Sequence, residues 1–242
     1  MGIQHATMNE PARYELLDNP IWNSLTTSHA SLALGEGLAR RFPATIGPLS
    51  GLKEPSAEAY ADLAAIVPDG DIAALFLDRK LEVPEGWRLL RDGLLVQMVC
   101  REVPDSVGAG EAIVPLGPAD CAEMLALATL TEPGPFREGT PTLGGFLGIR
   151  VDGRLAAMAG QRLAPTGFTE VSAVCTDPAF RGLGYAKALV AAVARQIQGA
   201  GRVPFLTSFA ANAGAIKAYE QAGFVARREF ELAVLAPPTS AI

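Results

Sequence analysis

The sequence has few of the residues from which metal sites and nucleophilic triads are usually built. Its 242 residues include only two histidines, His5 and His29, and three cysteines, Cys100, Cys121 and Cys175. Both histidines lie near the N-terminus, which argues against a His-rich metal site and against a Ser-His-Asp triad. The three cysteines are widely spaced, so we expect reduced, mostly buried thiols rather than a disulfide framework or a zinc site.

Basic charge and long apolar runs are also scarce. Residues 1–110 hold 9 Lys and Arg against 15 Asp and Glu, and residues 111–242 hold 11 of each. Neither half therefore has the basic excess of a non-specific nucleic-acid binder. Apolar stretches such as residues 186–194 are too short to span a bilayer, and residues 1–18 lack the apolar core of a signal peptide. We expect a cytoplasmic protein with neither a nucleic acid nor a membrane as partner.

Apolar residues are plentiful, at 49% of the chain, and charged residues make up 19%. The chain can therefore bury a sizeable core, and its length favours two modest domains or one large one. A stretch rich in Pro and Gly, residues 101–118, marks the expected boundary. We predict an N-terminal α/β domain over residues 1–110 and a second domain over 111–242. The first is either a degenerate relative of the second or an unrelated substrate cap.

Hydrophobic periodicity predicts the elements of both halves. In the first half we expect a helix over 55–66, a strand over 72–77, and a hairpin of 87–90 and 94–100 that turns at 91–93. The second half alternates strands and helices, which indicates an α/β or α+β fold. Its expected elements are a strand at 112–116, a helix at 118–130, a hairpin within 144–163 turning at 151–153, a strand at 170–176, a helix from 186, a strand at 203–209, a helix at 212–222 and strands around 224–235.

A glycine-containing turn joins the strand at 170–176 to the next helix, in the stretch "TDPAFRGLGYAKALVAA". Gly182 and Gly184 fall where backbone N–H groups at a helix start have no intrahelical partner, and glycines let a ligand approach them. Arg181 and Lys187 add positive charge, so a diphosphate is the natural guest. The alternative is a turn that only reverses the chain. The third glycine of the dinucleotide fingerprint is missing, and there is no Gly-Lys-Ser/Thr of an ATPase loop.

Two sequence blocks resemble those of the GNAT superfamily of N-acetyltransferases. "VSAVCTDPAFRGLGYAKAL" resembles its acetyl-coenzyme A signature, Arg/Gln-x-x-Gly-x-Gly/Ala, through Arg181, Gly184 and Ala186. "NAGAIKAYEQAGF" resembles its Asn-x-x-Ala…Tyr-x-x-x-Gly-Phe segment, with Asn212, Ala215, Tyr219, Gly223 and Phe224. The resemblance covers roughly residues 111–235. It implies a mixed central sheet flanked by helices, acetyl-coenzyme A as co-substrate, no metal, and a small-molecule or peptide amine as acceptor.

The resemblance also implies roles for individual residues. Main-chain groups of the strand would pair with the pantetheine arm, at Val174, Cys175 and Thr176. The turn would hold the pyrophosphate through Arg181, Gly182, Leu183, Gly184, Tyr185, Ala186 and Lys187. Asn212 would cap the next helix and touch the cofactor. Tyr219 would be the general acid, because an ordinary Tyr with a pKa near ~10 stays protonated at neutral pH; the alternative is a core Tyr.

The resemblance does not specify which residue acts as the general base. Simple alternation along the strand places Glu170, Ser172, Val174 and Thr176 on one face. Glu170 is our candidate base, acting through water or after burial raises its pKa; a solvated carboxylate, or one that binds a cationic substrate, is the alternative. Cys175 has no nearby His and is not expected to be a nucleophile. Rival functions are a non-catalytic acyl-coenzyme A sensor and a nucleotide-binding oxidoreductase. A homodimer is a reasonable expectation.

Overall fold

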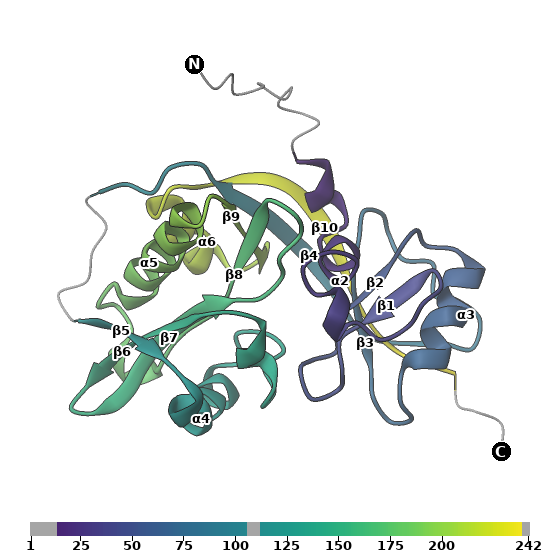
Figure 1. The fold of residues 1–242 in the computed structure, drawn as a ribbon, viewed down its shortest axis with the longest axis horizontal. Coiled ribbons are helices and arrows are strands. Elements are labelled where there is room, and N and C mark those ends of the chain that lie inside the picture. Colours follow the sequence, from purple (N-terminus) through teal and green to yellow (C-terminus); the bar gives the residue numbers. More distant parts are fainter. Residues whose placement is uncertain (1–13, 106–111, 239–242) are drawn as a thin grey trace.

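The computed structural model describes residues 14–105 and 112–238, so His5 lies outside it. An eight-stranded sheet runs through both halves of the chain, in the order β3-β10-β4-β9-β8-β7-β6-β5 (Figure 1). All neighbouring strands in it are antiparallel except β8 and β9, which are parallel. The expected mixed sheet flanked by helices is confirmed. The strands are β3 (Ala73–Leu77), β4 (Arg88–Cys100), β5 (Ile113–Leu116), β6 (Phe146–Val151), β7 (Arg154–Gln161), β8 (Phe168–Thr176), β9 (Val203–Phe209) and β10 (Phe224–Ala236).

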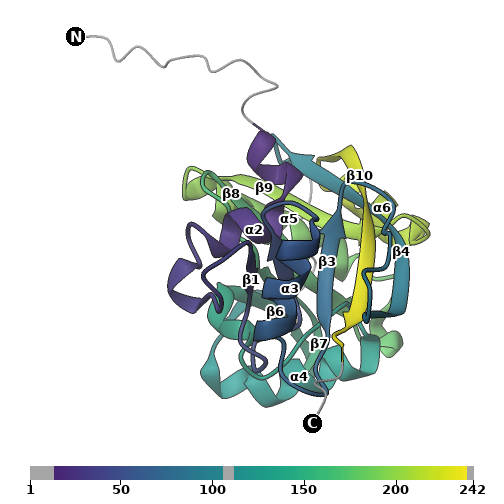
Figure 2. The ribbon, with the colours of Figure 1, turned by 90° about the vertical axis from the view of Figure 1, so that its right-hand side faces the viewer.

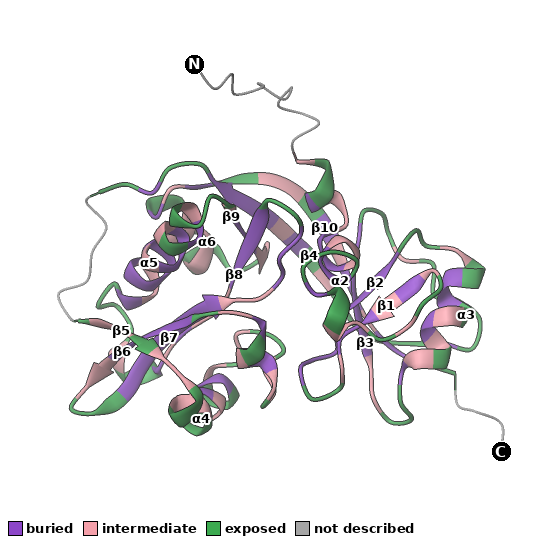
Figure 3. Ribbon diagram, viewed as in Figure 1, coloured by how far each residue is buried: buried purple, intermediate pink, exposed green. Residues whose placement is uncertain are grey.

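Helices cover both faces of this sheet, because its central strands are apolar on both sides. On β9, Leu206 packs into the cluster around α5 (Tyr185–Gly199), whereas its neighbour Phe205 packs into the cluster around α2 (Pro20–Leu25). Successive side chains of a strand point to opposite faces, so α5 and α2 lie on opposite sides. α6 (Ala213–Gln221) packs beside α5, and α4 (Cys121–Thr131) packs on the other face against β7 and β8. Figure 3 shows buried positions along most of α5, which packs against the sheet and against α6.

The first half adds a small layer at the β3 end of the sheet. A two-stranded sheet, β1 (Ala39–Arg41) with β2 (Ser50–Leu52), packs with α3 (Ala57–Ile66). Leu63 of α3 shares a buried cluster with Leu75 of β3 and Leu235 of β10, and Figure 2 shows these elements from that end. The short 3-10 helices are Glu15–Asp18, Ala30–Leu32, Pro118–Asp120, Thr140–Leu143 and Pro178–Phe180.

The hairpin expected over 87–100 is wrong, because these residues form the single strand β4. Asp92 and Gly93 pair with Ala233 and Leu232 of β10 rather than making a turn. The glycine is explained by packing: a Cβ at Gly93 would lie 3.0 Å from the ring of Phe209. β4 lies between β9 and β10, so strands from residues 1–110 and from 111–242 share one sheet. Of the predicted boundary segment 101–118, residues 106–111 lie outside the described part of the chain.

Most other predicted elements are confirmed within a few residues. The β6–β7 hairpin turns at Asp152 (φ 50°) and Gly153 (φ 79°), the backbone that two-residue hairpin loops require. The predicted 203–209 strand has the bounds of β9. Among the described residues, no helix combines the length and apolar character needed to cross a membrane.

Candidate active site

A gap opens between β8 and β9, the two parallel strands. They pair only where Phe168–Glu170 faces Val203–Phe205. Beyond Glu170, none of the described strands pairs with β8 on its β9 side, although β8 continues to Thr176. Main-chain groups of residues 171–176 on that edge therefore remain open to a ligand that adds itself like a strand.

A β-bulge reshapes β8 at this gap. The register with β7 shifts between Met158, opposite Cys175, and Gly160, opposite Ser172, and Ala173 has a φ of 50°. One extra residue on β8 reverses the alternation of the side chains that follow it. Val171 and Val174 therefore pack toward the same cluster around α5, whereas Cys175 packs toward α4. The predicted shared face of Glu170, Ser172, Val174 and Thr176 is wrong for this reason.

The glycine turn ends the gap at the start of α5. Asp177 holds the turn, because its Oδ1 accepts a hydrogen bond from the Ala179 N–H at 2.9 Å and its Oδ2 pairs with Arg154 at 3.1 Å. Gly182 (φ 83°) and Gly184 (φ 80°) have no protein atom within 4 Å of a notional Cβ. Their positive φ, rather than crowding by the protein, is what requires glycine here.

The turn presents donors and positive charge to solvent. Within the described chain, no residue accepts a hydrogen bond from the N–H groups of residues 182–187, and Gly184 is an N-cap without a side-chain bond. No described carboxylate pairs with Arg181 or Lys187. Free amides, a helix N-terminus and two cations make a site for phosphate groups. The hydroxyl of Thr176, buried and without a partner in the described structure, lies at the end of β8 next to this turn.

These features fit coenzyme A: an open strand edge for an amide-bearing arm, an orphaned hydroxyl, and an anion site beyond it. The structure brings together Val174, Cys175 and Thr176 on the gap and residues 181–187 at its end. Asn212 caps α6, as predicted, through a hydrogen bond that its Oδ1 accepts from the Ala215 N–H at 3.1 Å. Its contact with a cofactor stays a prediction.

Tyr219 projects from α6 into the cluster that covers β8. Burial, together with the neighbouring Cys175, raises its pKa to about 12. Tyr219 packs against the cluster that includes Val171 of β8, and no described residue hydrogen-bonds to its hydroxyl. The hydroxyl is therefore protonated at neutral pH and has a donor to spare. Burial raises the pKa of the Cys175 thiol to about 11, which keeps it protonated and unreactive.

Glu170 is fully buried where the gap begins. Its two carboxylate oxygens accept hydrogen bonds from Arg162, from Nε at 2.8 Å and from Nη2 at 2.9 Å. The alternative of a solvated carboxylate is therefore wrong. The Arg162 guanidinium thus hydrogen-bonds to both oxygens of the Glu170 carboxylate. A role of Glu170 as base stays a prediction.

Thr207 was not predicted as a site residue. It lies on β9, two residues beyond Phe205, where β9 and β8 part. Its hydroxyl is buried and has no hydrogen-bond partner in the described structure. In the sequence, the only indication that Thr207 belongs to a site is its position within the apolar run "VPFLTSF". A buried orphan hydroxyl is rare enough to mark a place where a ligand or water binds.

A cavity of about 330 Å³ lies between the two halves of the chain. One wall is the C-terminal end of α4 with residues 132–136, and the other comes from β3, β4 and β10. Ala128 and Phe136 in the first wall pack in the cluster that holds Cys175. The cavity therefore lies on the face of the sheet opposite α5.

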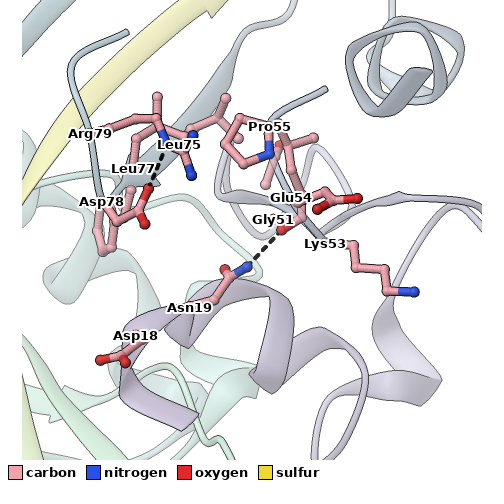
Figure 4. Close-up of a pocket in the computed structure, with 13 residues that line it drawn as sticks. Asp18, Asn19, Gly51, Lys53, Glu54, Pro55, Leu75, Leu77, Asp78 and Arg79 are labelled. Atoms are coloured by element: carbon pink, nitrogen blue, oxygen red, sulfur yellow. Dashed lines mark hydrogen bonds and ion pairs between the residues drawn. The ribbon is translucent and has the colours of Figure 1, made fainter. Parts of the chain in front are cut away.

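A second cavity of about 140 Å³ lies in the first half (Figure 4). Asn19 lines this cavity, and its side-chain amide donates a hydrogen bond to the Leu52 carbonyl at 2.7 Å. Both acidic and basic side chains surround it, among them Asp18, Lys53 and Arg79. None of the predicted site residues lines either cavity, so we assign neither of them to the reaction.

Comparison with known proteins agrees with this geometry. A family profile described as FR47-like protein matches residues 146–232. Among solved structures, the chain is similar to a protein from Novosphingobium aromaticivorans DSM 12444 assigned to the GNAT family of acetyltransferases, with 41% identity and a TM-score of 0.83 over 92% of this chain and 99% of that one. No curated protein matches the chain.

More distant structures share the fold. One is a GCN5-related N-acetyltransferase from Kribbella flavida, with 17% identity and a TM-score of 0.63 over 91% of this chain and 96% of that one. Another is a GCN5-related N-acetyltransferase-like protein from Streptococcus suis 89/1591, with 13% identity and a TM-score of 0.59 over 94% of this chain and 98% of that one. Fold and relatives together define an acyltransferase. The chain belongs to the GNAT family of acetyltransferases, which confirms the predicted family.

Proposed function

We propose that this protein transfers an acetyl group from acetyl-coenzyme A to a primary amine of a small molecule or peptide, by direct attack in a ternary complex. The observation that carries the proposal is the gap between β8 and β9. It combines an open strand edge, a free anion site at its end and the hydroxyl of Tyr219 beside it. The non-catalytic acyl-coenzyme A sensor is left as an outcome of the test below.

The chain's own residues divide the binding work. Main-chain groups of Val174, Cys175 and Thr176 would pair with the pantetheine amides, and residues 181–187 would hold the pyrophosphate. Asn212 would contact the cofactor from the start of α6. When bound, acetyl-coenzyme A supplies a thioester, an acyl group already activated for transfer.

In this transfer the amine nitrogen bonds to the acyl carbon, the carbon–sulfur bond breaks, and the nitrogen's proton must be removed while the sulfur gains one. Tyr219 would hold the proton for the sulfur at its hydroxyl, because its raised pKa keeps it protonated. The buried donor would sit in a low-dielectric site, where a hydrogen bond is electrostatically stronger than in water.

We propose that Glu170 takes the proton of the attacking amine through a bridging water molecule. Its carboxylate is buried and held by Arg162, so direct contact with an ammonium would require breaking that ion pair. Ser172 and Thr207 lie on β8 and β9 just past the pairing region and offer hydroxyls that would hold such a water.

The two halves would have different roles. Residues 111–242 would hold the cofactor, and residues 1–110, which place β4 beside β9, would help to shape the acceptor pocket. A cytoplasmic location, a homodimer and the lack of a nucleic-acid or membrane partner stay predictions.

The first test is calorimetric titration of the purified protein with acetyl-coenzyme A, with NADH as control. We expect micromolar binding of acetyl-coenzyme A alone, followed by thiol release when amines of several classes are added. Binding without turnover on any amine would favour the sensor. Absence of binding would mean that the turn at 181–187 only reverses the chain, and it would reject the proposed function.

A further inference from the structure

The strands of the two halves are arranged symmetrically about the central pair β10 and β4 (Figure 1). β3 pairs antiparallel with β10 on one side of this antiparallel pair, and β9 pairs antiparallel with β4 on the other. β2 runs parallel to β3 through a bridge between Leu49 and Ala74, just as β8 runs parallel to β9. β1 and β7 follow as the antiparallel partners of β2 and β8. Strand directions therefore repeat in the same order on both sides of the centre.

The connections between these strands repeat as well. In the first half the hairpin β1–β2 leads through α3 to β3, and in the second half the hairpin β7–β8 leads through α5 to β9. Leu75 of β3 shares a buried cluster with α3, whereas the neighbouring Ala74 shares one with α2, so the first half also has a helix on each face. The pair β2 and β3 is thus the counterpart of the pair β8 and β9. This agrees with the first half being a degenerate relative of the second.

The smaller cavity lies where β2 and β3 separate (Figure 4). In the described chain, the one main-chain hydrogen bond between the two segments runs from the Ala74 N–H to the Pro48 carbonyl, at 2.9 Å. Beyond it, residues 50–55 line one wall of the cavity and residues 75–79 line the other. The cavity is therefore the counterpart, in the first half, of the gap between β8 and β9.

Asn19 indicates which chemistry this cavity accepts. Its side-chain amide donates to the Leu52 carbonyl from the start of α2, so the group that satisfies the edge of β2 belongs to neither strand (Figure 4). An amide N–H of an added strand would make the same contact. Leu52 is buried, so this hydrogen bond forms away from bulk water. The edge of β2 can therefore bind an amide that enters between the strands.

The cavity has no counterpart of the anion site at residues 181–187. The segment between β2 and α3, residues 53–56, contains no glycine. The start of α3 is capped by its own sequence, because Ser56 Oγ accepts a hydrogen bond from the Ala59 N–H at 3.2 Å. Carboxylates outnumber cations in the lining, which contains Asp18, Glu54 and Asp78 with Lys53 and Arg79. A pyrophosphate would find neither free amides nor a positive field here.

We propose that the cleft between β2 and β3 is a second ligand site, which takes a short amide-bearing chain by strand addition and does not take whole coenzyme A. A pantetheine arm and a short peptide both have this chemistry, with amides separated by apolar carbon. The volume of about 140 Å³ is below the usual range of ligand pockets, so the cleft admits a fragment of such a chain. This site is separate from the transfer reaction and does not depend on the proposed function.

The test is an NMR titration of the isotope-labelled full chain with pantetheine and, separately, with N-acetylated dialanine amide. Acetyl-coenzyme A is added to saturation first, so that the gap between β8 and β9 is filled. It should leave the main-chain signals of residues 50–55 and 75–79 unchanged, because its pyrophosphate has no site there. We expect at least one of the two probes to shift these signals. A shift by pantetheine alone identifies a cofactor-like arm as the ligand, and a shift by the dipeptide alone identifies a peptide.

Variants assign the binding to the cleft. Asn19→Ala frees the Leu52 carbonyl, so the probe should bind about 2- to 10-fold more tightly, the effect of one hydrogen bond. Asn19→Trp fills the cavity and should abolish the shifts. Asn23→Ala and Asn23→Trp are the matched controls, because Asn23 donates a similar hydrogen bond, to the Leu16 carbonyl at 2.8 Å, but does not line the cavity. Melting temperatures check that each variant is folded.

Three results would overturn this assignment: neither probe shifts residues 50–55 and 75–79, acetyl-coenzyme A removes the shifts that a probe causes there, or Asn19→Trp and Asn23→Trp behave alike. The titration also separates this site from the proposed function. A probe bound in the cleft of a protein that does not bind acetyl-coenzyme A would reject the proposed function alone. Acetyl-coenzyme A binding with no probe in the cleft would reject the second site alone.

Discussion

The proposed coenzyme A site and the larger cavity between the two halves of the chain are built in opposite ways. The proposed coenzyme A site takes nearly all its residues from one stretch, 174–187, in which a strand, a turn and a helix start follow each other directly. The larger cavity takes its walls from segments between residue 48 and residue 234. A site encoded locally can be recognised as a motif, whereas a site assembled by topology becomes visible only once the strands are placed.

The change expected to have the largest effect breaks the local site. Gly184→Val puts a β-branched residue at a φ of 80° and a side chain where the phosphate would lie. We expect calorimetry to detect no acetyl-coenzyme A binding. Gly70→Val is the control, because Gly70 has a φ of 78°, has the same open surroundings and lies far along the chain from the turn. Equal binding by both variants would contradict the anion site.

Next comes the proposed general acid. Tyr219→Phe should lower kcat by about 10²–10⁴-fold while leaving acetyl-coenzyme A affinity unchanged. Because burial raises the pKa of Tyr219 to about 12, the protonated form persists well above pH 10, and kcat should not fall on the alkaline side through this group. Tyr60→Phe, in the cluster with α3, is the control. Wild-type turnover in Tyr219→Phe would leave Tyr219 a core residue.

Glu170→Gln tests the buried carboxylate at the point where the gap between β8 and β9 begins. The substitution leaves Arg162 with a single neutral acceptor, and losing a buried partner costs about 3 kcal/mol of the free energy of unfolding. If Glu170 also organises a water for the amine, kcat should fall while acetyl-coenzyme A affinity is kept. The double variant Glu170→Gln with Arg162→Gln separates these effects: recovered stability with kcat still low indicates a catalytic role, and recovery of both indicates a structural one.

The smallest expected effect is on stability, through the contact between the two halves of the chain. His29 is buried, its Nδ1 lies within hydrogen-bond distance of the Ser24 hydroxyl at 2.8 Å, and that hydroxyl oxygen accepts a hydrogen bond from the Ala164 N–H at 2.9 Å. Burial lowers the pKa of His29 below 6.5. The unfolded chain then binds the proton more readily, so stability is full above pH 6.5 and falls as the pH drops toward the lowered pKa.

We expect the melting temperature to fall by about 2–4 °C between pH 7 and pH 5.5 because of this group. His29→Gln should remove that part of the pH dependence. Thr27→Gln, an exposed neighbour, should keep it. An identical slope in wild type and His29→Gln would show that other groups cause it.

Much of the local structure was predictable because its signals are local. The Asp152-Gly153 turn requires positive φ, and the apolar spacing of α5 matches a helix. The errors came from long-range packing: Gly93 makes room for Phe209 rather than turning the chain, and the Ala173 bulge depends on pairing with β7. Periodicity contains no information on which strands become neighbours, so neither the place of β4 inside the sheet nor the cavity between the two halves could be predicted.

The interleaving of the strands also constrains how the protein is made. β3 and β4 are synthesised early, but the strand that lies between them, β10, ends at Ala236. Until the ribosome has released that residue, both strands carry unpaired edges and apolar faces, which favour aggregation. The first half therefore cannot complete its core during translation. The whole sheet can pair only once β10 has been made.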